Sequence, residues 1–102
     1  FLSATELSTL IKAKEVSPVE ATQAYLDRIT LVDSKLNSYI TVCREEALAQ
    51  ASKAENEITA GRYIGPMHGI PVAVKDQFYT TGIRTTNGST IHQNFIPEED
   101  TI

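Results

Sequence analysis

The sequence is poor in cysteine and has no tryptophan, no long apolar run and no cluster of basic residues. Its one cysteine, Cys43, cannot form an internal disulfide and has no second thiol with which to build a zinc cluster. No apolar stretch approaches the roughly 20 residues of a membrane-spanning helix, and no signal peptide is visible. We therefore expect a protein without a membrane partner, and the low cysteine content points to the cytoplasm.

Length and charge further limit the classes of protein to which this chain can belong. The 102 residues suffice for one domain of modest size. Apolar residues make up 41% and charged residues 22%, which is typical of a globular chain with a core rather than of a disordered one. The net charge is −4, and the missing basic patch argues against direct contact with nucleic acid.

Start and stop signals predict three helices in the first part of the chain. Ser3 and Glu6 have capping-box spacing, so the first helix should begin near residue 4. Ser17 followed by Pro18 predicts a second helix that runs to about residue 31. A third helix, with an alanine-rich stripe suited to close packing, should follow residue 44 and stop at Gly61.

Two segments have the composition of strands. Residues 39–42 are β-branched or aromatic, and residues 70–74 form an apolar run typical of a strand buried on both faces. Residues 80–88, rich in Thr and Gly, should be mostly turn, and a short helix is expected within residues 89–94. This order predicts an α/β layered protein. Two strands are too few for an independent sheet, so the fold should be unfinished at its C-terminal end.

The segment that could carry out catalysis is the apolar run at residues 70–74 together with Lys75, which follows it. If residues 70–74 form an interior strand, Lys75 enters a region of low dielectric, where desolvation lowers the pKa of its amine. A lysine that is neutral near pH 7 can accept a proton and act as a general base. On the pattern alone, the competing interpretation is a lysine that extends to water while its stem covers apolar surface.

A wider block around this lysine resembles the amidase signature family. The similarity is most specific where the lysine motif and the Thr/Gly-rich segment stand, and it continues more weakly through the N-terminal helices. It rests on Gly65-Pro66-Met67-His68-Gly69-Ile70-Pro71-Val72-Ala73-Val74-Lys75-Asp76 and on Thr80-Thr81-Gly82-Ile83-Arg84-Thr85-Thr86-Asn87-Gly88-Ser89, followed by Pro97 and Asp100.

This resemblance implies an α/β/α fold with a central mixed β-sheet, of which residues 1–102 would be the N-terminal portion. Residues 1–62 would supply the N-terminal helices, residues 65–102 the lysine-bearing strand and its turns, and the remainder of the domain would be absent. It also implies hydrolysis of a small-molecule amide by a serine, a bridging serine with a cis peptide bond, and Lys75 as the base. No cofactor or metal is implied. Both serines would lie beyond residue 102, so the chain alone should be inactive.

Three functions remain open. The first is a free-standing amidase with water as acyl acceptor. The second is the glutamine-hydrolysing A subunit of a tRNA-dependent amidotransferase, which commonly has Lys-Asp-Asn where this chain has Lys75-Asp76-Gln77, a departure that favours the first. The third is a complete small binding module, because an uncapped interior strand promotes association. Self-association into a homo-oligomer is left open.

The other chemically capable residues have simpler interpretations. Asp76 should turn away from Lys75 and bond to backbone or another side chain, because adjacent residues of a strand face opposite sides. His68 and His92 lack a matched nucleophile and metal-ligand neighbours, so packing or loop roles are favoured. Thr85, Thr86 and Ser89 are interpreted as turn residues that could also support the site.

Overall fold

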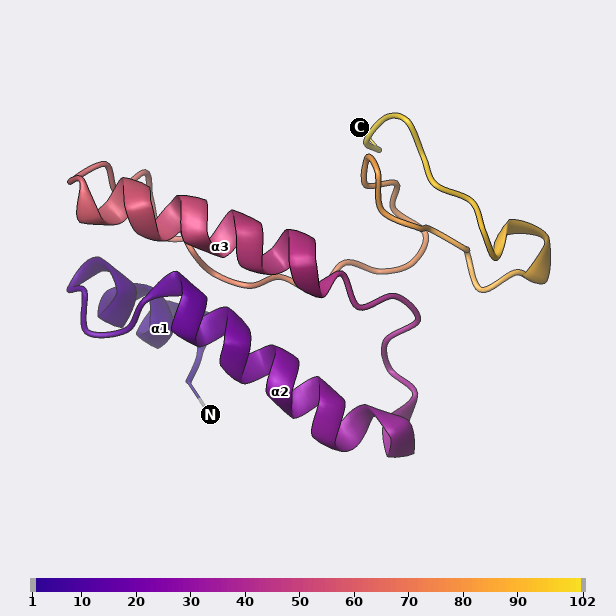
Figure 1. Cartoon of the computed structure of the whole chain (residues 1–102), viewed down its shortest axis with the longest axis horizontal. Helices are drawn as coiled ribbons and strands as arrows, with labels where there is room; N and C mark the ends of the chain where they lie inside the picture. Colours follow the sequence, from indigo (N-terminus) through magenta and orange to yellow (C-terminus); the bar gives the residue numbers. More distant parts are fainter. Residues whose placement is uncertain (1, 102) are drawn as a thin grey trace. The chain divides into compact units, whose positions relative to one another are not determined.

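The computed structural model describes residues 2–101, and its regular structure is helical. It contains helices α1 (Ala4–Lys12), α2 (Pro18–Leu36) and α3 (Arg44–Thr59) and a single 3-10 turn, η1 (Thr90–His92) (Figure 1). The chain divides into two units, which we describe separately. The helical unit comprises Phe1–Leu36 and Arg44–Pro71, and the loop unit comprises Asn37–Cys43 and Val72–Ile102.

Side-chain caps start the first two helices where the sequence predicts. The Glu6 N–H donates to Ser3 Oγ at 3.2 Å and the Ser3 N–H donates to Glu6 Oε2 at 2.7 Å, which completes the capping box of α1. At α2 the Glu20 N–H donates to Ser17 Oγ at 3.0 Å, and Pro18 occupies the first helical position. Each cap satisfies a backbone donor that the helix itself leaves free.

Residues with positive φ follow the ends of all three helices. The φ angles are 61° at Lys14, 52° at Asn37 and 86° at Gly61. Beyond α3 the Gly61 N–H donates to the carbonyl of Ile58 at 3.0 Å, and the next N–H donates to the carbonyl of Glu57 at 2.8 Å, the two bonds of a Schellman motif. Helix α2 runs to Leu36 rather than stopping near residue 31, because no glycine, proline or left-handed residue interrupts it earlier.

The core of the helical unit is a small apolar cluster between the helices. Helices α2 and α3 pack against one another, and the alanine-rich stripe of α3 faces inward as expected, with Ala51 buried. The loop that follows α3 closes the cluster. Its buried members are Leu7, Ile11, Ala21 and Ile58, with Val16, Tyr63 and Ile70 packed against them.

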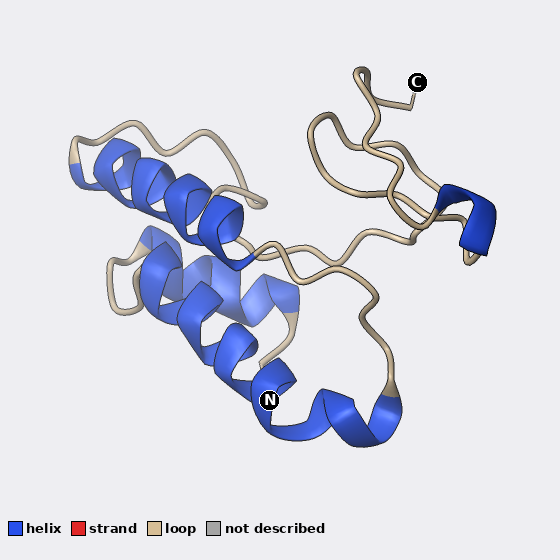
Figure 2. Ribbon diagram, turned by 45° about the vertical axis from the view of Figure 1, so that its right-hand side comes forward, coloured by secondary structure: helices blue, strands red, loops and turns tan. Residues whose placement is uncertain are grey.

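Neither predicted strand forms. Among residues 2–101 the only β pairing is an isolated antiparallel bridge between Thr80 and Ile83, and residues 39–42 and 70–74 are loops (Figure 2). The side chains of Val72 and Val74 are 65% and 57% exposed. The composition of these segments is that of a strand, but a strand needs a neighbour for its N–H and C=O groups, and the described residues supply none.

Hydrogen bonds join segments of the loop unit that lie far apart in the chain. The Thr85 N–H donates to the carbonyl of Phe95 at 3.0 Å, and the Gly82 N–H donates to the carbonyl of Pro97 at 3.0 Å. The predicted turn region and the short helical turn η1 are both confirmed. The Asp100 carboxylate accepts from both the N–H and the hydroxyl of Thr81, each at 2.8 Å.

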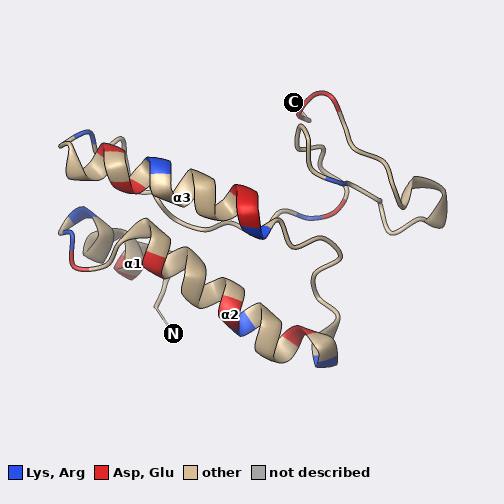
Figure 3. Ribbon diagram, in the orientation of Figure 1, with Lys and Arg blue, Asp and Glu red and all other residues tan. Residues whose placement is uncertain are grey.

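Charged residues are interspersed along the chain. Helix α2 carries both acidic and basic positions, and acidic positions occupy the first turn of α3, where the helix dipole favours them (Figure 3). None of the helices in residues 2–101 is both long and apolar enough to traverse a bilayer.

Candidate active site

Lys75 lies in an extended, exposed part of the loop unit. Its carbonyl accepts from the N–H of Gln77 at 2.8 Å and from the N–H of Phe78 at 3.1 Å, so the chain turns directly after it. The side chain is exposed, and the apolar residues before it are exposed too. The expectation that an interior strand encloses this lysine is therefore not met in the described residues, since the segment has no neighbouring strand to bury it.

Asp76 turns away from Lys75, as expected, and its carboxylate binds the turn at residues 86–88. The Thr86 N–H donates to Asp76 Oδ1 at 2.8 Å, and the Thr86 hydroxyl donates to Asp76 Oδ2. The Gly88 N–H approaches Oδ2 at 3.4 Å. The Asn87 N–H donates to the backbone carbonyl of Asp76 at 2.8 Å. We call this set of bonds between Asp76 and residues 86–88 the aspartate clamp.

These donors hold the pKa of Asp76 below its ordinary value. The hydroxyl of Thr86 is the largest cause, followed by the Thr86 N–H, with smaller effects from the Gly88 N–H and the positive charge of Arg84. A carboxylate that accepts hydrogen bonds in its ionised form resists protonation. Asp76 is therefore an anion at neutral pH, and it is already engaged by donors other than the Lys75 amine.

The two histidines have structural surroundings, as expected from the sequence. His68 Nδ1 accepts from the Ile64 N–H at 3.1 Å, and its Nε2 lies 3.0 Å from Glu57 Oε2. These partners favour the tautomer with the proton on Nε2, which fastens the loop after α3 to that helix. His92 packs edge-on against Phe95, with ring centroids 5.9 Å apart. Within residues 2–101, no group of three or more His, Cys, Asp and Glu side chains is placed so that it could hold a metal ion.

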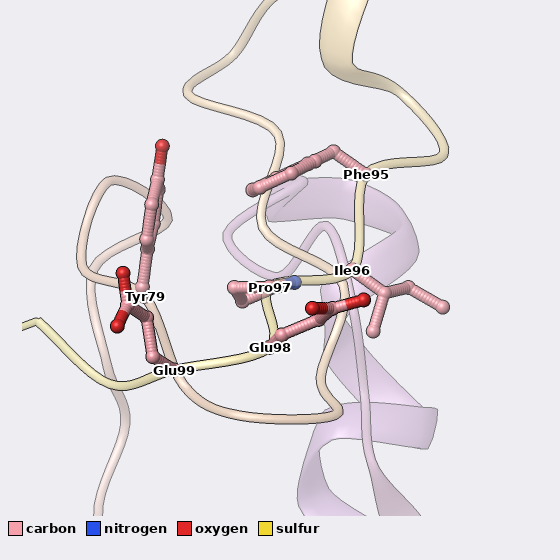
Figure 4. Close-up of a pocket in the computed structure, with 6 residues that line it drawn as sticks. All are labelled: Tyr79, Phe95, Ile96, Pro97, Glu98 and Glu99. Atoms are coloured by element: carbon pink, nitrogen blue, oxygen red, sulfur yellow. The ribbon is translucent and has the colours of Figure 1, made fainter.

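A shallow hollow of about 540 Å³ lies elsewhere in the loop unit. The rings of Tyr79 and Phe95 stand on two sides of it, with centroids 5.3 Å apart, while the side chain of Ile96 points away (Figure 4). Pro97, Glu98 and Glu99 complete its lining. None of the residues that line this hollow carries an amine, so Lys75, the residue predicted from the sequence, and the aspartate clamp remain the candidate site.

The family model named Amidase matches residues 20–102, which includes both Lys75 and the whole aspartate clamp. The chain belongs to the amidase family. This agrees with the resemblance found in the lysine motif and the Thr/Gly-rich segment.

Named relatives of this amidase-family chain fall into two groups. It is 57% identical over 99 residues to the A subunit of glutamyl-tRNA(Gln) amidotransferase from Geobacter sp. strain M21, and 47% identical over 100 residues to that from Carboxydothermus hydrogenoformans. These matches cover 97% and 98% of this chain but 20% and 21% of the relatives. The native peptide amidase from Stenotrophomonas maltophilia matches with a TM-score of 0.89 and 33% identity, over 95% of this chain and 20% of that one. The chain thus spans about a fifth of the length of the proteins it matches.

One functional feature was only partly foreseen from the sequence. Thr86 is expected to be a turn residue, yet its side chain is also the main partner of Asp76, and the residue is only 3% exposed. The sequence signal is the Asn87-Gly88 pair, because that pair is typical of tight turns whose N–H groups point to one side. The sequence pattern does not identify Asp76 as the partner of Thr86, because Asp76 lies ten residues earlier in the chain.

Proposed function

We propose that this chain is part of an enzyme that hydrolyses carboxylic amides, and that Lys75 is its general base. The observation that carries the proposal is that Lys75 lies inside the segment matched by the family model. It stands at the start of a turn, and the aspartate clamp fixes the residue after it, Asp76. Residues 1–102 would form the N-terminal part of one amidase domain in a cytoplasmic enzyme. The rest of that domain would supply the serines and the central mixed β-sheet.

The proposed hydrolysis of the amide proceeds in two stages, and the C–N bond breaks in the first. A serine Oγ attacks the carbonyl carbon while its proton passes through a bridging serine to the Lys75 amine, and the proton then moves to the leaving nitrogen. Ammonia or an amine departs and an acyl ester remains. Water, deprotonated by the same relay, attacks the ester, and the carboxylic acid is released. No cofactor takes part, because every bond that forms or breaks involves only the amide, water, the two serines and the Lys75 amine.

The environment of Lys75 sets a requirement for this chemistry. An amine accepts a proton only in its neutral form, and removal from water disfavours the charged form. Here the lysine is exposed, and so are the apolar side chains of Val72 and Val74 that precede it. We propose that strands from the remaining part of the domain pair with residues 70–74 and cover this surface, which would also enclose Lys75.

The test uses the full-length enzyme and two substitutions at the same position. Lys75→Ala and Lys75→Arg should both abolish amide hydrolysis, since alanine has no base and guanidinium does not release its proton in this pH range. Lys53→Ala, at an exposed position of α3, is the matched control and should retain activity. Ammonia release from small carboxamides and from glutamine measures turnover. Turnover like that of the unmodified enzyme in either Lys75 variant would refute the assignment.

The amide itself is the second question, and the named relatives favour glutamine. Each of the two amidotransferase relatives above is more similar to this chain than the peptide amidase is, at 57% and 47% against 33% identity. This supports the A subunit of an amidotransferase, in which glutamine donates ammonia, over the free-standing amidase favoured by Gln77. Glutamine hydrolysis that rises when partner subunits are added supports the amidotransferase. Rapid hydrolysis of simple carboxamides by the enzyme alone supports the free-standing amidase.

A further inference from the structure

A tight turn at Thr86–Ser89 organises the donors that reach Asp76. Its two central residues, Asn87 and Gly88, have φ angles of 53° and 67°, and the Ser89 N–H donates to the carbonyl of Thr86 at 2.9 Å. Positive φ at both central positions defines a type I′ turn, which Asn-Gly adopts at little cost. This geometry leaves the backbone N–H groups of Thr86, Asn87 and Gly88 available to Asp76, and all three donate to it.

The Thr86 hydroxyl connects the two sides of the clamp. It donates to Asp76 Oδ2 and accepts from the Gly88 N–H at 3.2 Å. The Thr86 side chain therefore links the turn to the carboxylate and also joins two residues within the turn. The hydroxyl is nearly inaccessible to water, since Thr86 is only 3% exposed. Hydrogen bonds to an ionised acceptor are stronger than neutral ones. The position of residue 76 is therefore fixed by several bonds at once.

We propose that the aspartate clamp positions Lys75 for proton transfer, a role that rests on the function proposed above. The carbonyl of Lys75 is held in the turn by two N–H groups, and the next residue is held by the clamp. The backbone from which the amine extends is thus fixed from its C-terminal side. Catalysis by a positioned group is sensitive to displacement, and about 1 Å can cost on the order of 100-fold in rate.

The clamp has a second consequence for the charge of the amine. A free carboxylate beside a lysine favours the charged ammonium and so opposes its use as a base. Within residues 2–101, Asp76 forms no ion pair with Lys75, because its oxygens face the turn, with Arg84 as the nearby cation. Holding the carboxylate on Thr86 keeps it away from the amine. Asp76 and Thr86 are therefore positioning residues that act through Lys75.

Substitutions at Thr86 and Asp76 in the full-length enzyme test this role. Thr86→Val removes the hydroxyl at similar volume and should lower kcat by about 10- to 100-fold while KM changes little. The released carboxylate can then approach the lysine, so the rise of kcat with pH should move to higher pH. Asp76→Asn should lower kcat without that upward move, because it leaves no anion to pair with the amine. Thr86→Ser restores the hydroxyl and should recover most of the activity.

A second aspartate–threonine pair in the loop unit supplies the matched control. Asp100 accepts from the N–H and hydroxyl of Thr81, the same pair of donors that Thr86 offers to Asp76. Thr81→Val should therefore leave kcat and its pH profile within about twofold of the unmodified enzyme, since neither Thr81 nor Asp100 belongs to the aspartate clamp and the lost hydrogen bond should alter stability rather than rate.

The outcomes separate this proposal from the one on which it rests. If Lys75→Ala is inactive but Asp76→Asn and Thr86→Val keep the normal kcat, the positioning role is refuted and the general base stands. If Lys75→Ala remains active, the proposed function itself fails. A loss of kcat in Thr81→Val equal to that in Thr86→Val would also refute the positioning role, because the effect would then follow from a general loss of order in the loop unit. Should Thr86→Val not fold, Asp76→Asn and the recovery in Thr86→Ser decide the matter.

Discussion

Gly69 is where the helical unit should be most sensitive to one added methyl group. Its φ is 85°, and a Cβ built there would lie 2.6 Å from Pro18 Cγ, 3.1 Å from Pro18 Cβ and 3.6 Å from Ile11 Cγ2. Favourable contacts between carbon atoms lie at about 3.5–4.0 Å. The new atom would therefore need a shift of about 1 Å in the rigid ring of Pro18, at the buried start of α2.

The expected loss for Gly69→Ala has two parts. The left-handed conformation costs alanine about 1–2 kcal/mol, and overpacking a filled site costs about 1–3 kcal/mol. Together these lower the free energy of unfolding by about 2–5 kcal/mol. Gly61 provides the control, because its φ is 86° and a Cβ there meets nothing within 4 Å. Gly61→Ala should lose only the first part, so the difference between the variants measures the clash.

Urea unfolding of the full-length protein, with hydrogen exchange of the α1 and α2 amides, measures both losses. Pro18→Ala in the Gly69→Ala background removes the ring atom at 2.6 Å, so the two changes together should cost less than the sum of their separate costs. Equal losses in Gly61→Ala and Gly69→Ala would refute the reasoning, because both share the backbone penalty and only one has the contact.

Two further outcomes follow from the structure. The pKa of Asp76 is lowered on folding from its ordinary value of 3.8, so its stabilising contribution is complete above that value and is lost as the pH falls through the lower folded value. Asp76→Asn should therefore flatten the dependence of the unfolding midpoint on pH below about 4, and an unchanged acid limb would contradict this. The isolated 102-residue chain should be poorly soluble or loosely packed, because Val72, Val74 and Ile91 are 65%, 57% and 88% exposed; a sharp, cooperative thermal transition of the monomer would contradict that.

Local sequence signals determined where α1 and α2 start and where α3 ends, but not the end of α2. The starts of α1 and α2 follow from Ser3 and Ser17, whose side chains bond to N–H groups three residues later. The end of α3 follows from Gly61, because glycine adopts positive φ without strain. The Asn87-Gly88 turn is equally local, because it depends on two adjacent residue types, whereas membership in the amidase family follows from a match over residues 20–102.

Tertiary structure alone decided the rest. Residues 39–42 and 70–74 have the composition of strands, but strand formation depends on a neighbour that the described residues do not contain, so both remain loops and Lys75 is exposed. The partner of Asp76 was likewise beyond the sequence pattern, because a hydrogen bond between residues ten positions apart depends on how the loop folds back. Spacing along the chain specifies local geometry, whereas burial and long-range pairing depend on which surfaces meet.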